Sequence, residues 1–107
     1  MLSIVHKQGF LTKAPVRRGV GRRTRRWIEL YDEKITWSVV KHGTPKGCLP
    51  LDGASVATLV QDGLEVRIRD GLALTLSSEE CNDIDEWHVA IREVIARAAM
   101  ALSLIHI

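Results

Sequence analysis

Three Asp-Gly dipeptides punctuate the middle of the chain and limit how long any regular element there can be. They are Asp52-Gly53, Asp62-Gly63 and Asp70-Gly71. Asp-Gly is typical of tight turns between antiparallel strands, because glycine accepts backbone angles that other residues resist. At Asp70-Gly71 we expect a type I′ hairpin turn. Short apolar runs separated by such turns at close spacing predict a sheet sandwich or a barrel.

The apolar runs between turn signals predict seven strands. The alternation is clearest after Gly63, where Leu64, Val66 and Ile68 are interleaved with charged residues. We place the strands at about Ser3–Lys13, Arg23–Tyr31, Lys34–Lys41, Gly47–Leu51, Ser55–Val60, Leu64–Arg69 and Leu72–Leu76.

The hydrophobic period changes after the seventh strand. Apolar residues then recur at spacings of three and four, at Ile84, Trp87, Ile91, Val94 and Ala98, which is typical of one face of an α-helix. Ser77 or Ser78 is the expected helix cap. A near-closed barrel with this helix over one end is a natural way to bury the apolar stripe.

The length of 107 residues is that of one domain. We place the domain at residues 1–98. The apolar tail, residues 99–107, ends in ALSLIHI, which can prolong the helix but also resembles peptides made by translating vector DNA. We therefore assign the tail no function.

The formal net charge of +2 conceals a strong separation of charge along the chain. Residues 1–50 carry eleven Lys or Arg and three Asp or Glu, whereas residues 51–107 carry four and ten. If the fold keeps the two ends apart, the molecule has one basic face. Such a face attracts polyanions without specifying which kind.

Much of the positive charge lies in one segment, KAPVRRGVGRRTRRW, which runs from Lys13 to Trp27. Pro15, Gly19 and Gly21 within it predict a loop. Three interpretations compete: an arm that binds nucleic acid, a cradle for membrane phosphates, or a solvated loop without a role. The arm has no interleaved aromatic residues for base stacking, which disfavours nucleic acid.

Other classes of site have little support in the sequence. The four histidines are scattered, Cys48 and Cys81 have no metal-ligand spacing, and no nucleophile, base and orienting group are spaced for catalysis. We therefore expect no enzyme activity, no metal and no cofactor. The cysteine usage favours a cytoplasmic chain with free thiols, and no apolar run approaches the ~20 residues that cross a bilayer.

Four segments together resemble the pleckstrin homology (PH) domain. They are GFLTK (Gly9–Lys13), RRWIEL (Arg25–Leu30), PKGCLPL (Pro45–Leu51) and DEWHVAI (Asp85–Ile91), the last of which contains Trp87 at the position of the family's signature tryptophan. The resemblance implies a mainly β fold with one α-helix. It would be a seven-stranded, partly open antiparallel barrel of two near-orthogonal sheets, capped by a C-terminal amphipathic helix. It also implies phosphoinositide binding at the open end, which many members of the family show.

Strand alternation gives an independent check on the basic residues, because side chains two apart share a face. Lys13 follows Leu11 and Arg26 precedes Ile28, so both cations should point inward at the last position before the same loop. Arg25 should face outward. By resemblance, Lys13, Arg26 and Lys46 match phosphate-binding positions, and Arg22 and Arg23 could assist. Thr24 departs from the pattern, because strong phosphoinositide binders usually have Lys or Arg there.

We therefore expect a membrane-targeting or adaptor module, cytoplasmic and peripheral to the membrane. It would bind phosphoinositide headgroups through Lys13, Arg22, Arg23, Arg26 and Lys46. The alternative is a protein-interaction module attracted only non-specifically to anionic lipid. We expect a monomer or one part of a larger multidomain protein.

Overall fold

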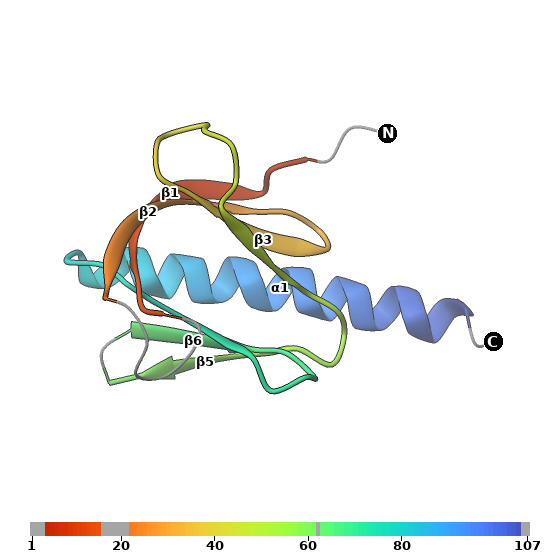
Figure 1. Ribbon diagram of the computed structural model, residues 1–107. Helices are drawn as coiled ribbons and strands as arrows, with labels where there is room; N and C mark the ends of the chain where they lie inside the picture. The colour runs from red at the N-terminus through yellow and green to blue at the C-terminus, as the bar shows by residue number, and fades with distance from the viewer. Residues whose placement is uncertain (1–3, 16–21, 62, 106–107) are drawn as a thin grey trace.

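The computed structural model describes residues 4–15, 22–61 and 63–105, and within them it contains seven strands followed by one long helix (Figure 1). The strands are β1 (Lys7–Lys13), β2 (Thr24–Leu30), β3 (Lys34–Ser38), β4 (Gly47–Pro50), β5 (Val56–Val60), β6 (Gly63–Arg67) and β7 (Ala73–Ser77), and the helix is α1 (Cys81–Ile105). The seven predicted strands are thus confirmed in order and approximate position.

All seven strands belong to one antiparallel sheet in the order β4-β3-β2-β1-β7-β6-β5. β4 and β5 are its two edges, so the sheet is not closed. Only two residue pairs, Thr12↔Ser77 and Lys13↔Leu76, join β1 to β7. In Figure 1, β1, β2 and β3 therefore lie on one side of α1, and β5 and β6 lie on the other. The predicted mainly β fold, a partly open barrel with a C-terminal helix, is confirmed.

The core forms where the inward side chains of the strands meet the apolar stripe of the helix. Leu11, Ile28, Leu64 and Leu76 are buried on the strands. The helix contributes the predicted stripe, in which Ile84, Trp87, Ile91 and Val94 are all buried. Because strands alternate with period two and the helix with period 3.6, each element presents one apolar face to this core.

Two local expectations were wrong. At Asp70-Gly71 the hairpin is not type I′, because among the described residues only Gly63, Gly71 and His42 have a positive φ, and a type I′ turn needs one at Asp70 as well. Gly71 N–H instead donates to the carbonyl of Ile68 at 2.9 Å, which closes a turn in which Gly71 (φ 89°) takes the left-handed position.

The helix also begins later than the predicted caps. Ser77 is the last residue of β7, and the Ser78 hydroxyl accepts a hydrogen bond from the Glu80 N–H at 3.2 Å in the turn before the helix. At the other end, α1 continues past Ala98 to Ile105. A side-chain carbon added at Gly53 would lie 2.7 Å from the Cα of Ala99, so this part of the helix packs directly on the loop before β5. The domain boundary at residue 98 stays a prediction.

Candidate functional site

The first two strands bring two cations together on the inward face. β1 and β2 pair from Lys7↔Leu30 to Lys13↔Thr24, which places Leu11 opposite Arg26. Lys13 and Arg26 are therefore diagonal neighbours on the face that also carries the buried Leu11 and Ile28. Both cations are half-buried. The predicted inward orientation of Lys13 and Arg26 is confirmed.

The surroundings of Lys13 both stabilise and destabilise its charged form. Its ammonium nitrogen is 4.7 Å from the centre of the Trp37 ring, a cation–π contact that favours the charged form. It also lies 3.4 Å from the carbonyl oxygen of Ala14. Burial and, to a smaller extent, the neighbouring charge of Arg26 nevertheless lower the pKa of Lys13 below its usual 10.5. An anion beside Lys13 would favour its charged form and so oppose the effects of burial and of Arg26 on its pKa.

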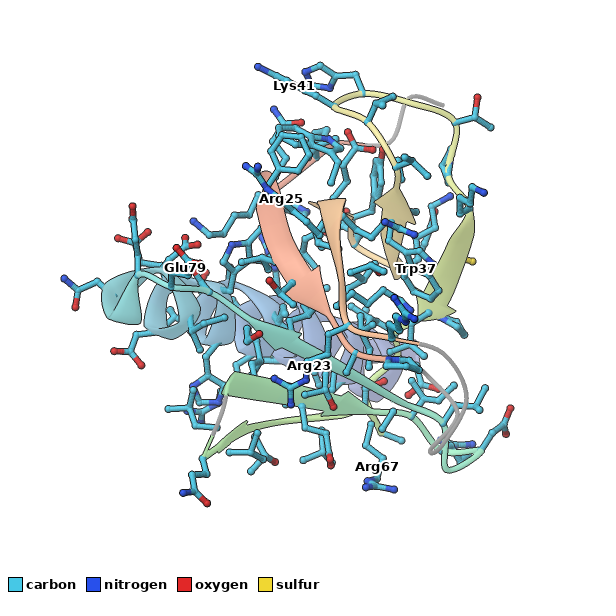
Figure 2. All side chains as sticks on the ribbon, turned by 60° about the vertical axis from the view of Figure 1, so that its left-hand side comes forward. Arg23, Arg25, Trp37, Lys41, Arg67 and Glu79 are labelled. Carbon is cyan, nitrogen blue, oxygen red and sulfur yellow. The ribbon has the colours of Figure 1, made fainter. Side chains whose placement is uncertain are left out.

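Arg26 and its neighbour Arg25 point to opposite faces of the sheet, as alternation predicts. Arg26 turns its guanidinium back to donate to the carbonyl of Arg25 at 2.9 Å. The Arg25 guanidinium lies over the ring of Phe10, with 4.3 Å from its central carbon to the ring centre. Figure 2 shows Arg25 and Trp37 on opposite sides of β1 and β2. Two consecutive arginines thus contribute charge to two separate surfaces.

Trp37 forms one wall of the inward-facing site. It pairs with Ile28 across β2 and β3 and with Gly47 across β3 and β4. A side-chain carbon added at Gly47 would lie 2.6 Å from the Trp37 ring, so glycine is what lets the indole lie flat over β4. Trp37 is half-buried on the inward face and contacts Lys13.

Thr24 sits directly opposite Lys13 in the register. It is half-buried and shares the inward face with Lys13 and Arg26. A residue at this position therefore points at the same space as the two cations. Its hydroxyl offers a hydrogen bond but no charge.

The structure does not bring the other predicted site residues into a hydrogen bond with this pair, as far as the described part of the chain goes. Arg22 and Arg23 are exposed immediately before β2. Lys46 is exposed before β4, and its backbone N–H donates to the carbonyl of Trp37 at 2.8 Å. Gly47 and Leu49 pair with Trp37 and Ile35 and share their inward face. Because side chains alternate along a strand, Lys46 is out of phase with that face. Arg17 and Arg18 of the basic run fall outside the described residues.

A polar and aromatic cluster on the outer face was missed by the sequence analysis. Trp27 packs edge-on against Phe10 and against His42, and it donates its indole N–H to the carboxylate of Glu29 at 3.2 Å. The Tyr31 hydroxyl donates to the same carboxylate at 3.1 Å. Burial together with Glu29 raises the pKa of Tyr31 above its usual 10.0. Phe10 lies directly opposite Trp27 on β1, and Glu29 and Tyr31 follow Trp27 at every second residue, so strand alternation alone puts these four side chains on one face. His42 comes from the loop after β3, and strand spacing could not place it there.

Arg25 belongs to a second surface of mixed charge. It lines a groove of about 550 Å³ together with Phe10 and three acidic residues that precede or begin α1, Glu79, Glu80 and Asp83. Figure 2 shows Glu79 near the start of α1, on the same side as Arg25. The carboxylates make this groove a poor place for an anion, unlike the inward-facing pair of Lys13 and Arg26.

Two classes of site receive no support from residues 4–15, 22–61 and 63–105. These residues hold no cluster of His, Cys, Asp or Glu suited to a metal ion. Within the same ranges, no helix combines the length and the apolar character needed to cross a membrane.

Comparison with known proteins yields likenesses of structure. No protein-family model matches the sequence, and no relative is found among curated proteins. Among solved structures, the C-terminal PH domain of pleckstrin in complex with an inositol pentakisphosphate superposes with a TM-score of 0.77 at 23% identity, covering 89% of this chain and 99% of that one. The PH domain of human oxysterol binding protein-related protein 11 gives 0.74 at 16% identity, with 89% and 83% covered.

A third structure, the same pleckstrin domain without a named ligand, gives a TM-score of 0.75 at 23% identity over 88% of this chain and 99% of that one. Identities this low establish the fold alone. The strand order, the open sheet and the C-terminal helix are those of these domains.

Proposed function

Because the chain has the pleckstrin homology fold, we propose that it is a binding module that recruits its protein to membranes by holding phosphoinositide headgroups at the open end of the barrel. One observation carries this proposal: Lys13 and Arg26 share the inward face beside Trp37, and the pKa of Lys13 is lowered by burial and by Arg26. Two cations held close together without an anion are unfavourable, and a phosphate between them removes the repulsion.

The chemistry of the two side chains suits a phosphorylated ring. The planar guanidinium of Arg26 can hold two phosphate oxygens, and the Lys13 ammonium can act as a compact second charge. The Trp37 indole offers an apolar wall beside them. The two solved pleckstrin C-terminal domains that contain inositol pentakisphosphates support this class of ligand for a chain with the same fold.

The exposed basic residues have a second role in this proposal. Arg22, Arg23 and Lys46 are exposed and strengthen attraction to an anionic leaflet, by about 1 kcal/mol for each basic residue near the surface. This contribution follows charge and does not select a headgroup. We place the module at the cytoplasmic face of a membrane, where phosphorylated inositol lipids and phosphatidylserine provide that charge.

The test compares lipid vesicles of equal surface charge. One series contains a single phosphoinositide each, and the reference contains phosphatidylserine at the concentration that gives the same charge, both at physiological salt. We expect preferential binding to at least one phosphoinositide. Binding that follows total charge alone would contradict the headgroup site and leave only non-specific attraction.

A further inference from the structure

The two edges of the open sheet differ in how well they are protected from pairing with another strand. β4 is four residues long and ends in Pro50, which cannot donate to a neighbouring strand. β5 reads VATLV, with three β-branched residues, no proline and no charge. Val56 and Leu59 are 56% and 46% exposed. An exposed, apolar, uncharged edge is the kind that accepts an added strand.

β5 faces α1 across a groove of about 540 Å³. Val56, Ala57 and Leu59 line it from the strand, and His88, Arg92 and Ile95 line it from the helix. Figure 1 shows β5 as the outermost strand on its side of the helix. The space is therefore bounded by the edge strand of the sheet on one side and by a helix on the other, which is the shape that an extended segment fills.

The hydrophobic core extends to this groove, where its last apolar side chain on β5 is partly exposed. Leu59 pairs with Leu64, so both side chains lie on the core face of the sheet. Leu64 is 0% exposed, whereas Leu59 remains 46% exposed because no strand follows beyond β5. Ile95 of α1 packs on the core from the opposite wall. An apolar side chain placed between Leu59 and Ile95 would continue the core by one more strand.

The backbone of β5 is also oriented for pairing. The carbonyl of Ala57 is 3.1 Å from Nε2 of His88, on the helix side of the strand. In an antiparallel pair, every second residue directs its N–H and C=O away from its partner strand. Ala57 and, two residues on, Leu59 therefore present backbone groups to the groove, and His88 occupies one of the carbonyls.

Charge identifies the kind of segment that fits. Arg92 and His88 are the only ionisable side chains among the described residues that line the groove, and none of its lining residues is acidic. A bound segment that carries a carboxylate can pair with the Arg92 guanidinium while its alternate side chains cover Leu59.

We propose that the groove between β5 and α1 binds an extended, acidic peptide segment of a partner protein, which adds to β5 as an eighth strand of the sheet. This site is separate from Lys13 and Arg26, so the domain can hold a partner and a membrane headgroup at different surfaces. The peptide would extend along β5 as far as His88, which contacts the carbonyl of Ala57.

The test uses a displayed library of random linear peptides, selected on the wild-type domain and then measured against three variants. Leu59→Pro removes an amide that points into the groove while leaving the ladder to β6 intact. Arg92→Glu reverses the charge. Arg97→Glu makes the same charge reversal at an exposed residue of α1 that does not line the groove, and is the matched control. Circular dichroism and amide spectra establish that each variant is folded.

We expect the enriched peptides to alternate β-branched and other residues, to contain Asp or Glu, and to shift the amide signals of Ala57 and Leu59 in the wild type. Their affinity should fall by about tenfold or more in Leu59→Pro, which loses one hydrogen bond and part of an apolar contact. It should also fall in Arg92→Glu but not in Arg97→Glu. Enriched peptides without carboxylates, peptides insensitive to Leu59→Pro and Arg92→Glu, or no enrichment at all would overturn the proposal. A wild-type dimer that Leu59→Pro dissociates would also overturn it, because a second copy would then be the occupant.

Discussion

The ammonium nitrogen of Lys13 lies 4.7 Å from the centre of the Trp37 ring, although the two residues come from strands separated by β2. Both side chains face inward at the open end of the sheet, and Arg26 lies between them on the intervening strand. This arrangement gives the domain a small cationic site with one aromatic wall.

Replacement of Thr24 by lysine should strengthen headgroup binding. Thr24 lies opposite Lys13 on the inward face, so the new ammonium would point at the same phosphate-sized space. We expect an affinity for inositol polyphosphates about tenfold higher, the scale of one added charge-assisted hydrogen bond. Calorimetric titration of both proteins with the same inositol polyphosphate measures the change.

Thr12→Lys is the matched control for Thr24→Lys, because Thr12 pairs with Arg25 and faces the outer surface of the same two strands. It adds the same charge on the wrong side. An equal gain in both variants would show that total charge, and not the inward position, determines the affinity.

The pKa of Lys13 should rise when an anion binds. In the free protein this pKa lies below 10.5, because of burial and then Arg26. A phosphate at the site favours the charged form, so the titration of the Lys13 side chain, followed by NMR, should move upward on addition of an inositol polyphosphate. An unchanged midpoint would place the bound ligand elsewhere.

The same lowered pKa predicts how stability depends on pH. The unfolded chain binds the Lys13 proton more tightly than the folded chain, so the charged lysine disfavours folding below its folded-state pKa. That effect disappears as the pH rises from the folded-state value towards 10.5. Denaturant unfolding should therefore show a stability difference between Lys13→Met and wild type that shifts in favour of the wild type across this window. A constant difference would contradict the assignment.

Gly47→Ala should disturb the aromatic wall of the site. The added methyl carbon would lie 2.6 Å from the Trp37 ring, so the indole must move. We expect destabilisation of about 1–3 kcal/mol, the usual range for overpacking, a changed indole N–H signal for Trp37, and weaker headgroup binding. Gly9→Ala is the control, because its added carbon would meet Trp87 at an ordinary 3.8 Å. Similar behaviour of the two variants would show that the contact with Trp37 is unimportant.

Tyr31 should titrate above its usual pKa of 10.0, and Glu29 should be part of the cause. Burial raises the pKa first, and the hydrogen bond and charge of Glu29 raise it further. The chain contains one tyrosine, so the ultraviolet absorbance of phenolate reports on Tyr31 alone. Glu29→Gln should lower the midpoint towards 10.0. The raised pKa contributes stability at pH values below 10.0, and this contribution is lost as the pH rises through the folded-state value.

Periodicity predicted much of the fold because the strands and the helix each bury one face. Leu64 and Val66 alternate with polar residues, and Trp87 and Ile91 recur at helical spacing, so sequence alone assigned these to the core. The turn at Asp70 was harder. Asp-Gly fits several tight turns, and the choice depends on whether Asp70 or only Gly71 takes a positive φ, which neighbouring strands decide.

The sequence likewise predicted the position of some residues of the site and not of others. Alternation correctly put Lys13 and Arg26 inward and Arg25 outward, since parity along a strand is a local property. It could not place Lys46, because this residue precedes β4 and lies out of phase with Gly47. The groove beside β5 could not be predicted from the sequence, because it depends on which strand forms the edge of the sheet and on where α1 lies.

The most direct measurement compares two neighbouring arginines. Arg26→Ala and Arg25→Ala remove the same charge from adjacent residues on opposite faces of β2. Calorimetric titration of each variant and the wild type with the same inositol polyphosphate, at physiological salt, isolates the effect of position. We expect the affinity to fall by about tenfold or more for Arg26→Ala and to change little for Arg25→Ala. Equal losses in the two variants, or no loss in Arg26→Ala, would contradict a headgroup site at the open end of the barrel.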